Sequence, residues 1–578
     1  MIDFAILFLY FDSGDGYMGF IIKAVSFILS LIISIVSFFS PPAGEKIKEE
    51  INNYSFTVDT SVTGNVLTNP ASNVNIWSIE GNPFVNATAS EEYNIFEFVN
   101  YVQLMQCTGG SVERDLFKDP LDRTVMDDYD FTVLIENCRG VLNLGAKPML
   151  KLGSVPLKYS SNSTSEQYFG TNVYPPDDYN IYYNYIHAIA QALVDEFGID
   201  EVRSWRFGVM TEYENDAWFM AQSGDPDETA VEYCKLYDYT VAALVDVLGN
   251  DIFVGAHSMT VTEGLWDEKI FIEHVANGTN YKTGEKGTRI CYLSASFYDA
   301  CPGVFTSGYT LPETIAYLRK CADKAGLKNL IFGIDEGRIL EGNSRGAIDS
   351  QLLSRTVGYT WQAAYDARLY AQMFNNGINY FSSWGFLSNG LLDGNPTVAY
   401  HVASNAAKFD GAKLAKTEKN GNGFIYNAEV NAVSAYNEET DTVHIMAYNF
   451  KNDVEYAEKA DLEFTVKAPQ LSGEKVKVTA YVIDDDCNYF DEWIEDREKY
   501  GIGDDCFAWS PDCPQIDNPT TLQNPDARKI YYDELYKKYY ECSKLEPETF
   551  EAEIVNGEIT LDITLDPSAV VFYEITEA

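Results

Sequence analysis

The sequence predicts an α/β protein in which a (β/α)8 TIM barrel is followed by an accessory C-terminal β-sandwich domain. First, short apolar runs alternate with amphipathic helical stretches between residues 73 and 415. Second, the pattern changes after Thr417 to alternating strands joined by polar turns. Third, 46% of the 578 residues are hydrophobic, which is enough to build a core in both parts.

The first part of the chain contains eight apolar runs with the length of buried parallel strands. They are Val74–Ile79, Tyr101–Met105, Lys147–Leu152, Ser204–Met210, Ile252–Ala256, Ile290–Phe297, Leu330–Ile334 and Ile378–Trp384. Helical patterns separate several of them, at Tyr182–Phe197, Val231–Val247, Leu311–Ala325 and Arg355–Phe374. This alternation favours a closed barrel. The rival fold, a doubly wound open sheet, lacks its Gly-x-Gly-x-x-Gly turn after the first strand.

The second part, residues 416–578, reads as a β-sandwich because short alternating strands follow one another without long helices. Its predicted strands are Gly423–Ala435, Thr442–Phe450, Asp461–Val466, Lys475–Val482, Phe550–Val555 and Ala569–Ile575. An acidic, Tyr-rich insertion at about 484–544 interrupts it, with a short helical stretch at Asp526–Glu541. Residues 46–72 also contain a strand pattern, and we expect this segment to join the sandwich.

Residues 1–45 have the features of a signal peptide or a membrane anchor. The apolar run Gly19–Phe39 carries Lys23 near its start and is followed by Ser-Pro-Pro-Ala-Gly. Its length also approaches that of a membrane-spanning helix. We therefore expect a secreted or cell-surface protein, which contacts a membrane only if this segment is retained as an anchor. Met18 is an alternative start, because residues 1–17 carry three Asp and no basic residue.

Charge and motif content exclude several classes of function. The formal charge is 41 − 87 = −46, and binding to nucleic acid depends on Lys and Arg replacing phosphate counterions. No Cys-x-x-Cys pair, His-x-x-x-His spacing or Gly-x-Ser-x-Gly elbow occurs. We therefore expect no nucleic-acid partner, no metal and no cofactor. The ten cysteines could be free thiols or disulfides, and the sequence does not give a pairing.

Two predicted strands end in carboxylates, and barrel active sites lie at such strand ends. The fourth apolar run stops at Thr211-Glu212, and the seventh stops at Asp335-Glu336. Hydrolysis of a glycosidic bond requires two carboxyl groups, one protonated and one ionised, that face the same sugar from different strands. Glu212 and Glu336 are therefore the candidate catalytic residues.

The segments around these residues resemble clan A glycoside hydrolases. WRFGVMTEYEN is similar to the acid/base strand of the clan, and NLIFGIDEGRI is similar to its nucleophile strand. The flanking GAKPMLKLGSVP, the Pro-Pro-Asp-Asp-Tyr stretch and the predicted sandwich resemble family 39 most, over about residues 70–480. Family 39 contains β-xylosidases and α-L-iduronidases. The resemblance implies that Glu212 is the general acid/base and Glu336 the nucleophile, in a retaining mechanism without a cofactor.

Three positions depart from the pattern of the clan. Thr211 replaces the usual Asn before the acid/base, which places the usual contact with the sugar 2-hydroxyl in doubt. Asp335 adds a negative charge directly before Glu336. The second strand ends Gln106-Cys107, where many relatives carry Arg. We interpret these departures as signs of unusual specificity, because both glutamates are present.

Further strand ends supply candidate substrate-binding residues beside Thr211. The resemblance implies that Tyr298 hydrogen-bonds the nucleophile and that Trp384 forms the floor of the −1 subsite; each could instead be a structural residue at the barrel rim. His257 could bind sugar hydroxyls or be a buried structural histidine. Lys151 and Arg338 could recognise an acidic sugar. A surface-directed Lys151 and an Arg338 paired with a nearby acid are the alternatives.

These observations predict a retaining glycoside hydrolase that acts on an oligo- or polysaccharide and is β-xylosidase-like or acts on a related glycoside. A catalytically inactive surface carbohydrate-binding protein on the same barrel is the alternative, and an inverting enzyme is a further one. The sugar, its linkage and exo or endo action depend on loops whose positions the sequence does not fix.

Overall fold

The computed structural model describes residues 50–76, 79, 93–163, 169–261, 268–298, 300–301, 304–305, 308–338, 359–383, 396–506 and 522–578. Residues Asn52 to Ala578 form one compact unit. The predicted signal peptide or anchor lies outside the described residues. Within the described ranges, the helices are all too short or too polar to cross a bilayer.

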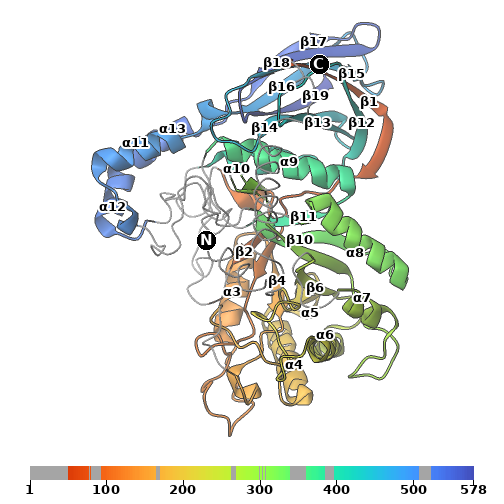
Figure 1. Ribbon diagram of the computed structural model, residues 1–578, viewed down its shortest axis with the longest axis vertical. Coiled ribbons are helices and arrows are strands. Elements are labelled where there is room, and N and C mark those ends of the chain that lie inside the picture. Colours follow the sequence, from red (N-terminus) through yellow and green to blue (C-terminus); the bar gives the residue numbers. More distant parts are fainter. Residues whose placement is uncertain are drawn as a thin grey trace, which may run out of the picture. The chain divides into compact units, whose positions relative to one another are not determined.

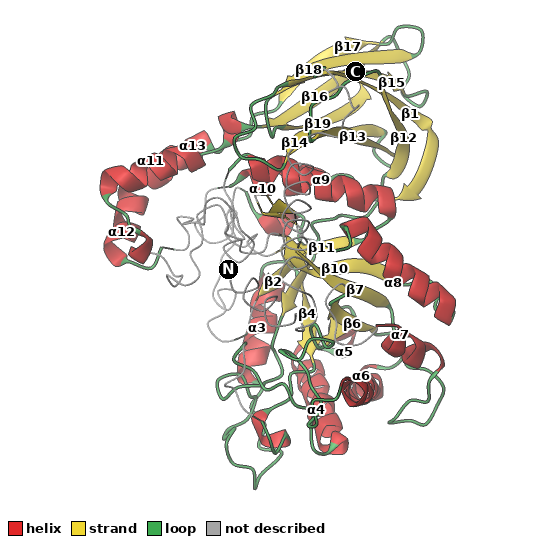
Figure 2. Cartoon of the chain, in the orientation of Figure 1, coloured by secondary structure: helices red, strands yellow, loops and turns green. Residues whose placement is uncertain are grey.

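The predicted barrel is confirmed: eight parallel strands close on themselves in the order β10-β11-β2-β3-β4-β5-β6-β7 (Figures 1 and 2). Their bounds are β2 Asn73–Ile76, β3 Tyr101–Leu104, β4 Lys147–Leu152, β5 Arg206–Val209, β6 Phe253–Met259, β7 Tyr292–Tyr298, β10 Ile331–Arg338 and β11 Tyr380–Ser383. A short hairpin, β8 Ala300–Cys301 with β9 Val304–Phe305, follows β7. The predicted run at Ile378–Trp384 is shorter as a strand, and Trp384 lies outside the described residues.

Amphipathic helices surround the barrel and bury their apolar faces. They are α3 Thr132–Asn143, α4 Tyr179–Phe197, α5 Ile199–Arg203, α6 Pro226–Leu248, α7 Glu268–Asn277, α8 Leu311–Ala325, α9 Trp361–Asn376 and α10 Val398–Ala407. Local sequence fixes several ends. Asp225 caps the start of α6 in front of Pro226, while Thr310 and Glu313 form a capping box on α8. Gly326 then ends α8 in the left-handed conformation.

The interior of the barrel is polar toward the carboxyl ends of the strands. Alternate strand residues face inward, and these include Gln103, Lys151, His257, Ser294 and Asp335, each at most 2% exposed. Two inward glycines leave room for large neighbours. A Cβ on Gly208 would collide with His257, and a Cβ on Gly333 would collide with the ring of Tyr380.

The second part is a nine-stranded sheet that folds over as a sandwich, in the order β17-β16-β19-β14-β13-β12-β1-β15-β18. Its strands are β1 Asn53–Val66, β12 Lys413–Asn420, β13 Ala428–Asn437, β14 Thr442–Lys451, β15 Ala460–Lys467, β16 Lys475–Ile483, β17 Glu548–Glu553, β18 Glu558–Leu565 and β19 Val570–Glu577. Phe464 of β15 meets Tyr573 of β19, five places away in the sheet, at 6.0 Å between ring centroids. This contact joins the two layers. The sequence reading missed β12 and β18.

β1 precedes the barrel in the chain yet lies inside this sheet, between β12 and β15. It pairs antiparallel with β12 and parallel with β15. Tyr54, Phe56 and Val58 alternate into the core of the sandwich. The chain therefore crosses from the sandwich into the barrel and back again.

The insertion between β16 and β17 is helical where the structure describes it. It contains α11 Phe490–Tyr500, α12 Pro525–Ile530, the π-helical turn η10 Tyr531–Leu535 and α13 Tyr536–Cys542. The sequence reading missed α11. The insertion is attached to the barrel helices: the Thr360 hydroxyl bonds Asp485, and His401 of α10 bonds the Ser543 carbonyl.

Several cysteines whose side chains the structure describes are free thiols, namely Cys107, Cys138, Cys234, Cys291, Cys487, Cys506 and Cys542. Cys506 and Cys542 belong to the insertion, where a disulfide was one of the alternatives. Cys513 lies outside the described residues.

Candidate active site

The segment after β5 has a strained backbone that carries the first candidate pair, Thr211 and Glu212. Met210 has φ 62° and Glu212 has φ 40°, values that side chains other than glycine seldom adopt. The Met210 amide donates to the Leu152 carbonyl at 2.6 Å, and the Asn215 amide donates to the Glu212 carbonyl at 2.8 Å. These bonds hold the turn in place, although each strained residue costs about 1–3 kcal/mol.

The second candidate pair, Asp335 and Glu336, lies in a β-bulge of β10. Against β7, the register passes from Ile334 opposite Ala295 to Glu336 opposite Ser296, which leaves Asp335 as an extra residue. In a regular strand, two successive side chains point to opposite faces. A bulge removes this alternation and redirects a side chain. Both carboxylates consequently bond residues on the same, inward face of β7.

Two hydroxyl groups bind the carboxylate of Glu336, which is 6% exposed. The Tyr298 hydroxyl donates to Oε1 at 2.7 Å, and the Thr211 hydroxyl lies 3.4 Å from Oε2. The predicted substrate-binding residues Tyr298 and Thr211 therefore both contact Glu336. Donors to the ionised form favour a carboxylate over a carboxylic acid.

The carboxyl of Glu212 has a different environment. Its Oε2 accepts a 3.3 Å hydrogen bond from Asn215. Burial and the negative charge of Glu336 together raise the pKa of Glu212 to about 7, while Lys151 opposes the shift. Glu336 is thus close enough to affect the ionisation of Glu212, and Glu212 is mostly protonated below about pH 7.

Lys151 of β4 is buried inside the barrel, 2% exposed, so the interpretation of a surface-directed lysine is wrong. Its ammonium finds no hydrogen-bond acceptor among the described residues. Burial lowers the pKa of Lys151 to about 8, against the opposing charges of Glu336, Asp335 and Glu212. The group is therefore cationic at neutral pH and lies beside the three acidic residues.

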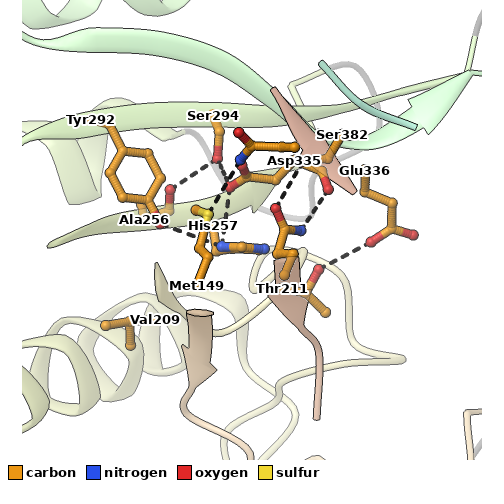
Figure 3. A network of polar contacts seen from close by, with 12 residues as sticks. Met149, Val209, Thr211, Ala256, His257, Tyr292, Ser294, Asp335, Glu336 and Ser382 are labelled. Carbon is orange, nitrogen blue, oxygen red and sulfur yellow. Dashed lines mark hydrogen bonds and ion pairs between the residues drawn. The ribbon is translucent and has the colours of Figure 1, made fainter. Parts of the chain in front are cut away.

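Asp335 is the centre of a buried polar network beneath the two glutamates. Figure 3 shows Ser294 and His257 pointing toward Asp335, while Thr211 points toward Glu336. The Tyr380 hydroxyl donates to Oδ1 at 2.6 Å, and the Ser294 hydroxyl donates to Oδ2. His257 Nδ1 lies 3.1 Å from the same Oδ2.

The backbone of the bulge is also fixed from below. The side-chain amides of Gln103 and Asn75 donate to the Asp335 carbonyl at 2.7 and 2.9 Å. Five groups from five other strands therefore bind this one residue, counting the three donors to its carboxylate. This network restricts the position of the neighbouring Glu336.

His257 is neutral in this setting. Burial lowers its pKa well below the usual value, and the charge of Lys151 lowers it further. The neutral ring donates from Nδ1 to Asp335, with the Tyr292 hydroxyl 3.4 Å from the same nitrogen. Nε2 is then an acceptor, and no described residue bonds it. The predicted contact between His257 and a sugar hydroxyl could involve only this atom.

The structure brings together most of the predicted site residues: Thr211, Glu212, Tyr298 and Glu336 at the strand ends, with Lys151 and His257 below them. The side chain of Arg338 is not among those described, and Trp384 is outside the described ranges. Sequence reasoning missed the roles of Ser294, Tyr380, Gln103 and Asn75 as partners of Asp335. Their inward alternation along predicted strands was the available signal.

Chemically, this arrangement presents a proton donor and an ionised carboxylate to one location. Glu212 is mostly protonated below about pH 7, whereas the carboxylate of Glu336 accepts hydrogen bonds from two hydroxyl groups. A carboxylic acid and a carboxylate that share a pocket can protonate a leaving group and attack, or stabilise, an electron-poor carbon.

The sequence of the chain matches that of a known enzyme family. A model of the glycosyl hydrolases family 39 matches residues 115–499. A β-xylosidase of Geobacillus stearothermophilus is 32% identical over 127 residues, which are 22% of this chain and 24% of the relative. A β-xylosidase of Caldicellulosiruptor saccharolyticus is 28% identical over 131 residues, 23% of this chain and 25% of the relative. The matched region thus spans only a minor part of each relative.

Solved structures resemble the chain over most of its length. A monomeric β-xylosidase from Caulobacter crescentus CB15 has a TM-score of 0.59 at 14% identity, covering 90% of this chain and 99% of that one. A family 39 enzyme from Xanthomonas axonopodis pv. citri has a TM-score of 0.59 at 12% identity, covering 93% and 100%. A bacterial orthologue of human α-L-iduronidase scores 0.60 at 13% identity, covering 91% and 84%. At these identities the likeness shows a common fold.

Proposed function

We propose, because the chain belongs to family 39 of the glycosyl hydrolases, that it hydrolyses O-glycosidic bonds by a retaining double displacement. In this mechanism Glu212 protonates the leaving oxygen while Glu336 attacks the anomeric carbon. Glu212 then acts as the base that activates water against the glycosyl-enzyme. The reaction uses only these two side chains and a water molecule.

The observation that carries the proposal is the difference between the two carboxyl groups. Burial and the charge of Glu336 raise the pKa of Glu212 to about 7, as a general acid at mildly acidic pH requires. Glu336 accepts hydrogen bonds from Tyr298 and Thr211, which favour the ionised nucleophile. The environments therefore match the proposed roles.

We infer that the substrate is a β-xyloside or a related glycoside. The support is that the curated relatives are β-xylosidases and that similar folds include β-xylosidases. A screen of aryl glycosides that differ in sugar and anomeric configuration tests this inference. Highest kcat/KM on an aryl β-xyloside supports it, and preference for another sugar by tenfold or more contradicts it.

A 2-deoxy-2-fluoro-β-xyloside with a good leaving group tests the mechanism. The fluorine slows hydrolysis of the glycosyl-enzyme, so a retaining enzyme accumulates the covalent ester. We expect mass spectrometry of peptides to find the adduct on Glu336, and the Glu336→Gln variant to be inactive. An adduct on another residue, or near-normal activity of that variant, would reject the assignment.

The Glu212→Ala variant tests the acid/base. Aryl xylosides with very good leaving groups need little protonation, so the variant should cleave them far better than alkyl xylosides. Added azide should restore turnover and give a β-xylosyl azide, because an anion can enter the space of the missing carboxylate. An equal loss on both kinds of leaving group would contradict the role of Glu212.

The alternative function is carbohydrate binding without turnover, and the replacement of the usual Asn by Thr211 motivates it. In the structure Thr211 contacts the proposed nucleophile, so its hydroxyl is engaged in the site. The fluoroxyloside distinguishes the alternatives: a binding protein would show affinity for xylosides with no adduct.

A further inference from the structure

We propose that Lys151 is a positioning residue whose buried ammonium is the counter-charge of the proposed catalytic pair, and that it sets the pH range of activity. The inference rests on the roles proposed above for Glu212 and Glu336. It goes beyond them, because a mechanism with two carboxyl groups does not itself require a cation.

The burial of Lys151 is the first observation. The residue follows Met149 on the inward face of β4, and only 2% of it is exposed. No acceptor for its ammonium exists among the described residues, although buried cations are almost always paired. Burying this ammonium costs desolvation free energy, and no direct hydrogen bond repays that cost. Its presence therefore indicates a purpose other than stability.

The second observation is the set of groups that face Lys151 from the surrounding strands. They are Glu336 and Asp335 of β10, Glu212 after β5, Cys107 after β3 and His257 of β6. Burial keeps the Cys107 thiol and the His257 ring uncharged, raising the pKa of the first and lowering the pKa of the second. Lys151 is therefore the cation beside three acidic side chains, of which Glu212 has the raised pKa.

Asp335 explains why a cation is needed. Three donors stabilise its carboxylate, and the bulge brings it next to Glu336 on the inward face. Without compensation, this second anion would oppose ionisation of the nucleophile and of the acid/base alike. The charge of Lys151 offsets that repulsion without a direct hydrogen bond to either glutamate.

The test is the pH dependence of kcat/KM for the full chain and its variants, which reports the essential acid and base of the free enzyme. Lys151→Met keeps an unbranched side chain, one heavy atom shorter, and removes the charge. Both limbs of the profile should move to higher pH, by about one unit or more. Asp335→Asn should move the acidic limb to lower pH. The double variant Lys151→Met/Asp335→Asn should return the acidic limb toward its wild-type position.

Lys158 provides a matched control, because it is also buried but is paired with Asp128 at 2.6 Å. Lys158→Met should lower the melting temperature and leave the limbs in place. Lys151→Met should move both limbs, so the limbs and not the melting temperature distinguish the two lysines. If Lys151 were only structural, its removal would lower the melting temperature and leave the limbs unmoved, which would overturn the proposal.

Failure of the inference differs from failure of the proposed function. If the wild-type protein forms no fluoroxyloside adduct, the retaining mechanism is contradicted. If the adduct forms on Glu336 but the limbs of Lys151→Met coincide with those of the wild type, only the role of Lys151 is overturned. Moved limbs that the double variant does not restore would contradict compensation between Lys151 and Asp335.

Discussion

At the scale of single residues, the two glutamates of the site differ in their hydrogen-bond partners. Glu212 receives a long amide contact from Asn215, and the Ser296 hydroxyl also lowers its pKa, whereas Glu336 receives two hydroxyl contacts. Hydrogen bonds to a charged group contribute about 1.5–3 kcal/mol, roughly twice those of neutral pairs. The Tyr298 hydroxyl, at 2.7 Å, is the shorter of the two contacts to Glu336.

We predict that Tyr298→Phe lowers kcat by about tenfold to a hundredfold, which corresponds to one charged hydrogen bond. KM and the melting temperature should change little, because the ring remains in place. Steady-state kinetics and thermal melting check this. Tyr309→Phe is the control, since Tyr309 is 47% exposed and should tolerate the change. Unchanged kcat in Tyr298→Phe would mean that Glu336 does not depend on this hydroxyl.

At the scale of elements, the bulge in β10 decides which side chains reach the site. It allows Asp335 to fill the barrel interior while Glu336 faces the strand ends. The strand also passes very close to β7 at this point, because a Cβ on Gly337 would collide with the Phe297 carbonyl. The position of the proposed nucleophile therefore depends on the absence of a side chain at residue 337.

We predict that Gly337→Ala destabilises the fold by about 1–3 kcal/mol, the usual cost of overpacking, and reduces kcat/KM by more than tenfold. The added methyl must push β10 away from β7 and so displace Glu336. Chemical denaturation and kinetics measure the two effects. Gly64→Ala in β1 is the control, because its Cβ would make only ordinary contacts at 3.6 Å. Full activity of Gly337→Ala would show that the strand can shift without moving the glutamate.

At the scale of the whole molecule, the barrel, the sandwich and the helical insertion are joined by buried contacts. His401 of α10 donates from Nε2 to the Ser543 carbonyl at 2.7 Å, which attaches the end of the insertion to a barrel helix. Burial lowers the pKa of His401 to about 4, although the hydrogen bond to Ser543 opposes the shift. Protonation of this histidine is therefore coupled to unfolding.

We predict that His401 contributes acid sensitivity between about pH 6.5 and pH 4. In that window the unfolded chain binds a proton on His401 that the folded chain does not, so stability falls as the pH falls. The His401→Gln variant lacks this contribution. Relative to the variant, the wild type should therefore lose about 2–3 kcal/mol of unfolding free energy between pH 7 and pH 4. Denaturation at several pH values measures it. Substitution of the partly exposed His187 is the control. A stability difference between the wild type and His401→Gln that does not change with pH would contradict the prediction.

The sequence by itself determined the class of fold and the order of the barrel strands. Alternation of apolar runs with helical patterns predicted all eight barrel strands, because burial on both sides imposes continuous apolar composition. The same reasoning identified Glu212 and Glu336 as strand-end candidates, and the resemblance to clan A added Tyr298. The strand β12 was missed because it is exposed at many positions and lacks a strong apolar pattern. The strand β18 does alternate apolar residues, at Ile559, Leu561, Ile563 and Leu565, and the sequence reading overlooked this signal.

Only the tertiary structure decided how the charges of the site are distributed. Strict alternation along β10 would place Asp335 and Glu336 on opposite faces, and the bulge that overrides it depends on contacts with β7 and β11. Similarly, the burial of Lys151 follows from closure of the barrel around it, because a lysine in a strand is compatible with a surface or an interior. Both facts involve residues far apart in the chain, and local sequence patterns contain no information about such contacts.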